Sequence, residues 1–573
     1  MFLPTTKQEL GELGWKKLDV ILVTGDSYVD SPFVGVSVIG KVLVEAGYRV
    51  GIIAQPDVHS DRDISRLGEP ELFWGVTGGC IDSMVANYTA TKKRKKTDDM
   101  TPGGKNDRRP DRAVIVYTNL IRRFFKRTKP IVLGGVEASL RRVAHYDYWS
   151  DNVRRSILFD AKADLLVYGM AEKTVVALAE CLSAGGGVTA LRGICYISQE
   201  KINDYIELPS YAAVAGDEST FINMFHTFYR NNDPHTARGL CQKQDTRYLV
   251  QNPPAPYLTQ RELDEVYGLD FERDLHPFYE RQGSVKALET IKFSITTHRG
   301  CYGECNFCSI AVHQGRTVRW RGQTSILREA KRLTEYPDFK GYIQDVGGPT
   351  ANMYGFECEQ KLCRGSCADK RCLYPEICPQ LRIQTNHDRQ ITLLRNLGQI
   401  EGIKKIYIAS GIRYDLLLAD EKSGYEYLRQ VVQHHVSGQM KIAPEHTEDR
   451  VLRRMGKPGK ELLLTFKDWF YKLTRAAGKE QFLTYYLIAA HPGCTERDMW
   501  RLKRFASREL GISPEQVQVF TPTPSTYSTL MYYTEMDPFT GEKIFVEKAP
   551  AKKERQKQIV TEKRTRKRDR TEV

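Results

Sequence analysis

The chain has 573 residues, of which 41% are hydrophobic and 10% aromatic, and its formal net charge is +14. This length exceeds what one hydrophobic core supports, so we expect two or three domains, and the composition excludes a mainly disordered chain. No apolar run is long enough to cross a bilayer, and the first residues, MFLPTTKQELGELGW, lack the apolar core of a secretory signal. We therefore expect a soluble, cytoplasmic protein without a membrane partner.

The first part of the chain alternates apolar runs with helical stretches. A helix is expected over residues 34–47, and buried strands are expected at 18–25, 48–55, 112–118, 129–135 and 163–169. Apolar runs of this length, separated by helices, predict a parallel sheet covered on both faces. Residues 1–204 are therefore predicted to form a doubly wound α/β domain, with a polar, basic segment at 88–111 as an exposed insertion.

A second series of strands and helices follows a Pro-rich, polar stretch at 205–285, which we interpret as a connector. Helices are expected at 324–335 and 460–477, and strands at 290–296, 340–346, 404–409, 438–443, 482–488 and 515–520. Six β/α units predict a partial (β/α)6 TIM-like barrel over 286–535, with its working face at the carboxyl ends of the strands. A Cys-rich insertion interrupts it at 356–380, and residues 536–573 are expected to be a basic, disordered tail.

Two short segments hold most of the positive charge. Residues 91–112 carry nine basic and four acidic side chains, and residues 551–573 carry ten and four. Such segments suit nucleic acid by simple electrostatics, which leaves a nucleic-acid partner open. The alternative is a solvated segment that serves solubility.

Eight of the thirteen cysteines fall between Cys301 and Cys378. Disulfides are rare in the cytoplasm, so clustered cysteines there indicate metal binding or redox chemistry. Cys301, Cys305 and Cys308 form a CxxxCxxC loop directly after the first strand of the second series. Thiolates are the standard ligands of iron–sulfur clusters, and three of them leave one iron of a four-iron cubane open for a small molecule. A structural zinc site is the alternative, although its cysteines usually come in two pairs.

A second group of cysteines comes shortly after the second predicted barrel strand and comprises Cys358, Cys363, Cys367, Cys372 and Cys378. Five cysteines in 21 residues require a chemical reason in a reducing compartment. The spacing leaves open a second iron–sulfur cluster, a zinc site or a redox-active disulfide pair.

The CxxxCxxC loop resembles the defining loop of the radical S-adenosylmethionine (radical SAM) superfamily. The chain further resembles YgiQ-type radical SAM proteins with an N-terminal cobalamin-binding-like domain, through HYDYWSD at 145–151, CYGECNFCSIAVHQGR at 301–316, GGPTANMYG at 347–355, IAPEHTE at 442–448 and AHPGCT at 490–495. The resemblance implies a [4Fe-4S] cluster on Cys301, Cys305 and Cys308 and reductive cleavage of S-adenosyl-L-methionine to a 5′-deoxyadenosyl radical. The substrate is unknown, and an electron donor such as flavodoxin or ferredoxin is implied.

Polar and glycine residues at the ends of the predicted barrel strands are the candidates for binding S-adenosylmethionine. They are Gly347, Gly348, Thr350, Ser410, Arg413 and Glu445. In the superfamily a Gly-rich stretch contacts the amino group, and an arginine could pair with the carboxylate in a bidentate fork. An internal ion pair between Arg413 and Asp415 is the alternative.

The N-terminal domain resembles cobalamin-binding domains but lacks their usual lower-ligand histidine. The corresponding position reads Asp26-Ser27-Tyr28. Cobalamin is therefore not expected, and a scaffold that recognises substrate is the preferred role. Two rival functions remain: an RNA-modifying radical enzyme of the methylthiotransferase type, and a non-catalytic iron–sulfur electron-transfer protein.

Overall fold

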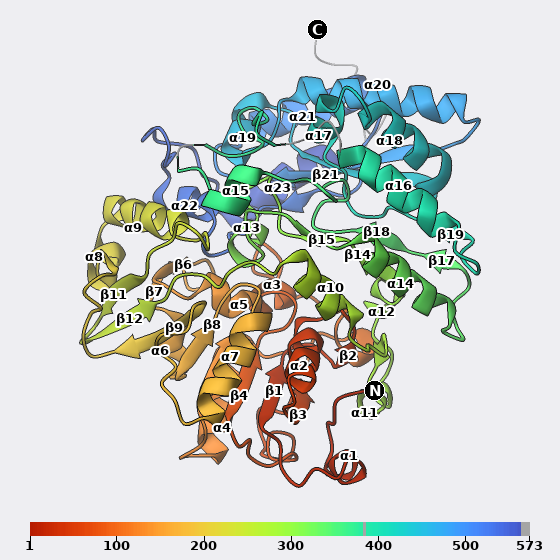
Figure 1. The fold of residues 1–573 in the computed structure, drawn as a ribbon. Helices are drawn as coiled ribbons and strands as arrows, with labels where there is room; N and C mark the ends of the chain where they lie inside the picture. The colour runs from red at the N-terminus through yellow and green to blue at the C-terminus, as the bar shows by residue number, and fades with distance from the viewer. Residues whose placement is uncertain (369, 382–385, 563–573) are drawn as a thin grey trace.

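The computed structural model describes residues 1–368, 370–381 and 386–562. Figure 1 shows a sheet-based N-terminal part, coloured red to yellow, packed against a green and blue C-terminal part. None of the helices in these residues is long and apolar enough to span a membrane.

Five parallel strands form the centre of the N-terminal sheet in the order β3–β1–β4–β5–β8. They are β1 (Val20–Thr24), β3 (Val50–Ala54), β4 (Phe73–Thr77), β5 (Ile131–Gly134) and β8 (Leu165–Val167). Helices α2 (Gly35–Glu45) and α7 (Glu172–Ser183) pack on one face, and α4 (Ala113–Phe124) packs on the other. The chain reverses direction across the sheet between β1 and β4, and such a switch point is where doubly wound domains bind ligands.

One predicted strand of this domain is a helix, and a real strand was not predicted. Residues 112–118 lie at the start of α4, whose buried Ala113, Val114, Tyr117, Leu120 and Ile121 follow helical spacing. The missed strand, β4, carries Gly75 and Thr77 among its apolar residues. A short apolar run is compatible with the spacing of a strand or of a helix. Here the helical spacing of buried residues continues to Ile121, which identifies the helix.

The predicted connector instead extends the same sheet. Strand β9 (Ile194–Ser198) runs antiparallel to β8 and is followed across the sheet by β12 (Arg247–Gln251), β11 (Leu240–Gln244) and β10 (Ile206–Leu208). Buried glutamines explain the polar composition of these strands. Gln242 Oε1 accepts a hydrogen bond from the Ala144 amide (2.9 Å), and Gln244 Oε1 accepts one from the Ser156 amide (2.9 Å). Polar side chains that pair with backbone in this way belong to a core despite their hydropathy.

The C-terminal part is built from short parallel strands with helices outside them. The strands are β14 (Ser294–Thr296), β17 (Tyr342–Ile343), β18 (Asp345–Gly347), β19 (Lys405–Ile406), β20 (Gln439–Glu445), β21 (Phe482–Ala489) and β22 (Gln518–Val519). The pairs β14–β18, β17–β19, β20–β21 and β21–β22 are all parallel. Helices α14 (Gln323–Thr334), α16 (Asn386–Gly398), α18 (Gly424–Gln430) and α20 (Lys460–Ala476) lie on the outside, as Figure 1 shows. The fold class is α/β with a TIM-like core.

The expected disordered tail is wrong for residues 536–562. Helix α23 (Pro550–Thr561) packs against α21 (Glu496–Arg508) and buries Gln556, Ile559 and Val560. Lys553 is 1% exposed, and its ammonium reaches the hydroxyls of Tyr532 (2.8 Å) and Tyr148 (3.2 Å). The basic composition led to the prediction of disorder. Lys553 can nevertheless be buried, because two tyrosines surround its ammonium group. The rest of the tail, 563–573, lies outside the described residues.

Candidate functional site

The CxxxCxxC loop lies between β15 (His298–Arg299) and α13 (Ile310–His313), beyond the carboxyl end of β14. Gly300 has a φ of +77°, and a Cβ there would lie 2.3 Å from the Thr317 carbonyl oxygen. Only glycine fits this turn, which starts the loop. The Asn306 amide donates to the Met455 carbonyl oxygen (2.9 Å), and the Cys308 amide donates to that of Cys305 (3.0 Å). The loop is therefore anchored to a distant part of the barrel.

The Cys-rich insertion supports the back of this loop. Glu304 is 5% exposed and pairs with Lys361 Nζ (3.2 Å), while Arg371 donates to the Glu304 carbonyl oxygen (3.0 Å) and to Asn306 Oδ1 (2.7 Å). The Tyr302 hydroxyl accepts a hydrogen bond from the Cys358 amide (3.2 Å). The insertion therefore holds the cluster loop in shape.

The three thiols of the loop are free and partly buried. Burial and the neighbouring Cys305 raise the pKa of Cys301, and the same causes raise the pKa of Cys308 to about 12. Cys301 and Cys308 therefore keep their protons until a metal displaces them. No group of three or more His, Cys, Asp or Glu side chains in the described residues is arranged for a single metal ion. A cubane does not need that arrangement, because each thiolate binds a different iron, so the donor set fits a cluster better than one zinc ion.

Arg413 contacts the cluster loop directly. Its Nη1 donates to Cys305 Sγ (3.6 Å), and its other nitrogens form a bidentate pair with Asp415, with Nε 2.9 Å from Oδ1. Arg413 is 8% exposed and Asp415 is 3% exposed. The internal ion pair considered from the sequence is present, so the fork of Arg413 faces Asp415 and its remaining nitrogen faces a thiol.

The Gly-rich stretch lies beside the loop. Thr350 Oγ1 is 3.8 Å from Cys301 Sγ. A Cβ on Gly348 would lie 2.6 Å from the His298 ring, so only glycine fits there. One strand further, Ser410 donates its hydroxyl to Asp345, which also accepts from the Ser410 amide (3.1 Å). Asp345, the first residue of β18, also belongs to this group, although it was not among the six residues predicted to bind S-adenosylmethionine.

Glu445 is the last of the six candidates along the chain. It ends β20 in the left-handed region, with a φ of +67°, and is 8% exposed. Burial raises its pKa, with Lys457 and Arg413 acting in the opposite direction. The six candidates therefore lie at the carboxyl ends of the strands around one loop, which is where a barrel places its working residues.

A cavity of about 650 Å³ connects this region to the N-terminal domain. Its lining includes Asp345, Gly347, Gly348 and Ser410 from the barrel and the ends of β1, β4 and β5 from the sheet. Arg299, next to the cluster loop, pairs with Glu172 at the start of α7, and both are buried. Arg299 Nε also donates to the Tyr267 hydroxyl (3.0 Å). Neither residue was predicted, because they lie 127 positions apart and no local pattern joins them.

Comparisons with known proteins agree with this architecture. The Radical SAM N-terminal family model matches residues 2–294. A UPF0313 protein of Fusobacterium nucleatum is 60% identical over 98% of this chain and 99% of its own length, and one of Thermotoga maritima is 52% identical over 96% of each chain. The chain belongs to the radical SAM superfamily. Within it, the chain is a member of the UPF0313 family, and it is an enzyme.

Two solved radical SAM enzymes are similar to this enzyme in structure at low sequence identity. The methyltransferase TsrM from Kitasatospora setae is 14% identical, with 89% of this chain and 74% of that chain covered and a TM-score of 0.47. The cobalamin-dependent enzyme OxsB is 13% identical, with 92% and 57% covered and a TM-score of 0.49. The absence of cobalamin from the present radical SAM enzyme stays a prediction.

The five cysteines of the second group in this radical SAM enzyme differ in their exposure to solvent. Cys358, Cys372 and Cys378 are buried, Cys363 is exposed, and Cys367 is intermediate. Cys358 and Cys372 pack in one apolar cluster with Tyr302, Met353 and Phe356. A second metal site in this group stays a prediction.

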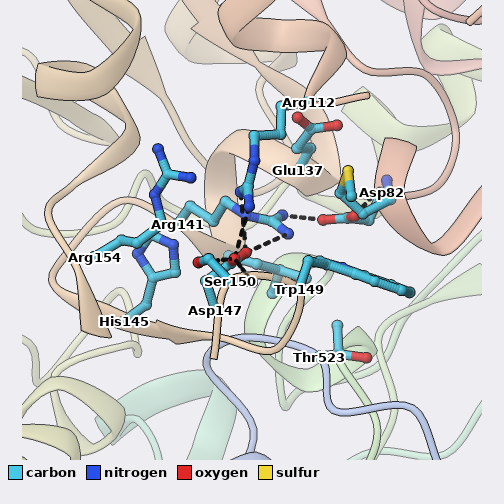
Figure 2. Close-up of polar contacts among 12 residues, drawn as sticks. Asp82, Arg112, Glu137, Arg141, His145, Asp147, Trp149, Ser150, Arg154 and Thr523 are labelled. Carbon is cyan, nitrogen blue, oxygen red and sulfur yellow. Dashed lines mark hydrogen bonds and ion pairs between the residues drawn. The ribbon is translucent and has the colours of Figure 1, made fainter. Parts of the chain in front are cut away.

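The HYDYWSD segment of this radical SAM enzyme forms a buried polar network. Figure 2 shows Arg112 and Arg141 converging on Asp147, with Arg141 also reaching Asp82. Asp147 accepts from Arg112 Nη2 (2.8 Å) and from the Ser150 amide (2.9 Å). Burial acts to raise the pKa of Asp147, but the hydrogen bond from Arg112 and the charges of both arginines outweigh it and lower that pKa. Each of these charges is paired within the protein, so the segment stabilises the scaffold.

Proposed function

We propose that this radical SAM enzyme holds a [4Fe-4S] cluster on Cys301, Cys305 and Cys308 and binds S-adenosylmethionine at the remaining iron. The observation that carries the proposal is that Thr350 and Arg413 contact thiols of one three-cysteine loop. The neighbouring strand ends, with Gly347, Gly348 and Ser410, line the cavity. When bound, the cluster supplies one electron that cleaves S-adenosylmethionine to methionine and a 5′-deoxyadenosyl radical, which abstracts a hydrogen atom from the substrate.

The residues around the loop have distinct tasks in this proposal. The backbone carbonyl of Gly348 and the carboxylate of Asp345 would accept hydrogen bonds from the ammonium group of S-adenosylmethionine. The Gly347 carbonyl oxygen already accepts from the Thr297 amide (2.7 Å) and hydroxyl (3.1 Å), so Gly347 serves to keep the backbone close. Thr350 and Glu445 are proposed to orient its hydroxyl groups. Arg413 is already paired with Asp415, so we assign it to the cluster thiolates and not to the carboxylate of S-adenosylmethionine.

The described structure gives little support to a nucleic-acid partner. In the basic segment, Arg109 is 1% exposed and pairs with Asp26, and Arg112 pairs with the buried Asp147, whereas Arg94 forms only a surface pair with Asp111. Cations that are already paired inside the protein release no counterions from a phosphate backbone. We retain a flavodoxin or ferredoxin as the proposed electron donor.

The proposal is tested on the full chain, reconstituted anaerobically with iron and sulfide. About four irons per chain are expected for one cluster, and about eight would indicate a second cluster in the insertion. After reduction, mass spectrometry should detect 5′-deoxyadenosine formed from S-adenosylmethionine. Cys305→Ala should lose iron, brown colour and 5′-deoxyadenosine formation, whereas Cys181→Ala, on α7 and outside the loop, should keep all three. Retention of full iron and activity by Cys305→Ala would contradict the proposal.

A further inference from the structure

The deep end of the cavity lies inside the N-terminal domain and is aliphatic. It extends between one face of the sheet and the two helices that cover that face. The residues that line it are Leu22, Val132 and Val167 from the strands, Val36 and Ile39 from α2, and Val175 from α7. A cavity of about 650 Å³ has the size of a binding site for a small organic molecule.

Four carboxylates and one guanidinium line this cavity, and three of the carboxylates are neutralised by the protein. Asp26 pairs with Arg109, Asp82 with Arg141, and Glu172 with Arg299. The two lining histidines are neutral at pH 7, because burial lowers the pKa of His298 to about 3 and that of His313 to about 4. Among the described residues that line the cavity, the only cation is therefore Arg299, and it already pairs with Glu172.

Asp345 is the remaining carboxylate. Its partners in the described structure are the Ala409 amide (2.8 Å), the Ser410 amide (3.1 Å) and the Ser410 hydroxyl. Under the proposed function, the ammonium of S-adenosylmethionine supplies its counter-charge. Every formal charge around the cavity is then matched before a substrate enters.

Two buried polar atoms of the lining residues have no hydrogen-bond partner within the described structure: Glu172 Oε2 and His298 Nε2. Glu172 is 3% exposed and His298 is fully buried. Buried polar atoms are almost always paired, so an unpaired set beside a cavity indicates a missing partner. Both residues line the cavity, Glu172 at the start of α7 in the N-terminal domain and His298 in β15 beside the cluster loop.

We infer that this cavity binds the substrate of the radical reaction, and that the substrate is an uncharged, largely apolar small molecule. Its polar end would hydrogen-bond to Glu172 and His298, and its apolar body would lie between the sheet, α2 and α7. An anionic substrate is excluded, because a buried phosphate or carboxylate would find no unpaired cation among the described lining residues, and burying an unpaired charge is costly. The inference rests on the proposed function for the placement of S-adenosylmethionine.

The test compares two probes that differ in one charged group. N-phenyl-1-naphthylamine is uncharged, and 8-anilinonaphthalene-1-sulfonate is the same molecule with a sulfonate. Equilibrium dialysis against the oxidised holoenzyme with saturating S-adenosylmethionine should show one molecule of the uncharged probe per chain. The sulfonate should bind at least tenfold more weakly. Equal or tighter binding of the sulfonate would overturn the inference.

Two variants locate the bound probe. Ala171→Trp fills the cavity at the start of α7 and should weaken binding of the uncharged probe at least tenfold. Ala184→Trp, on the exposed far end of the same helix, should leave binding unchanged. Iron content and thermal midpoint report whether Ala171→Trp folds, and Ile39→Trp on α2 serves as a second cavity-filling variant. Unchanged binding by a folded cavity-filling variant would place the probe elsewhere and refute the assignment.

The two proposals fail separately. A holoenzyme that binds the uncharged probe in this cavity but forms no 5′-deoxyadenosine would contradict the proposed function alone. A holoenzyme that forms 5′-deoxyadenosine but prefers the sulfonate probe would contradict only the inferred substrate class.

Discussion

Replacing Arg413 by methionine should lower the reduction potential of the cluster. Arg413 Nη1 lies 3.6 Å from Cys305 Sγ, and the residue is 8% exposed. At an effective dielectric constant of about 20, two unit charges at this distance attract by about 5 kcal/mol. Asp415, held by the same guanidinium, cancels most of that attraction, because its oxygens bind the other nitrogens of the fork.

The net effect is therefore closer to the energy of one charge-assisted hydrogen bond, about 1.5 kcal/mol. For a one-electron couple, about 1.4 kcal/mol corresponds to about 59 mV. Because the reduced cluster carries one more negative charge, loss of the guanidinium should shift the potential about 60 mV more negative. Asp415→Asn should shift it in the opposite direction, since it removes the cancelling charge.

The assay is an anaerobic redox titration followed by electron paramagnetic resonance of the reduced cluster. Arg413→Lys keeps the charge and should retain part of the potential. Arg395→Met, on the exposed surface of α16, is the control and should not change it. An Arg413→Met enzyme with full iron content and an unchanged potential would refute the electrostatic reasoning.

Three further predictions concern the scaffold. Burial lowers the pKa of Lys553 to about 8, below its unfolded value, so the unfolded state binds more protons and stability should rise between pH 8 and pH 10. Urea unfolding should show this rise in the wild type and not in Lys553→Met. Asp147→Asn should cost about 3 kcal/mol in urea unfolding at pH 7, because it leaves Arg112 unpaired, whereas Arg141 keeps Asp82 as its partner. The wild type should lose this contribution as pH falls below about 4, where the unfolded carboxyl is protonated and the native one is not. Equal stability of wild type and Asp147→Asn at pH 7 would contradict that assignment. Protein purified from cells grown with cobalamin should show no corrinoid absorbance, and a stoichiometric corrinoid would show that the missing histidine does not prevent binding.

The parts of the site that could be predicted from the sequence are those written in short stretches. Cys301, Cys305 and Cys308 lie within eight residues, and their chemistry depends on that spacing. The Gly-rich stretch could likewise be predicted, because glycines in a short stretch indicate a turn where a larger side chain would not fit. For Arg413 the sequence left two pairings open, and only the three-dimensional arrangement shows the fork on Asp415 and a single nitrogen on Cys305.

The parts that could not be predicted depend on contacts between distant segments. The Arg299–Glu172 pair joins the cluster loop to the N-terminal domain and has no local signature. Lys553 and Gln242 have polar side chains that suggest exposure, yet both are buried because their partners come from elsewhere in the fold. The alternation of strands and helices predicted the fold class. The helix at 113–124 was misassigned because its first five residues, 113–117, form an apolar run that resembles a strand.

Two buried arginines near the cluster loop bear on which substrate the enzyme can bind. Within the part of the chain that the structure describes, Arg413 contacts a cluster thiol, and Arg299 is the only cation that lines the cavity. Each is held by a carboxylate, Asp415 or Glu172, so neither is available to an anionic substrate. If the radical reaction instead required a phosphorylated substrate, that substrate would have to break the buried Arg299–Glu172 pair. Breaking such a pair costs about 3–5 kcal/mol, which corresponds to a loss of two to three orders of magnitude or more in affinity. The interface between the domains therefore selects against anions through the same contact that fixes the position of the cluster loop.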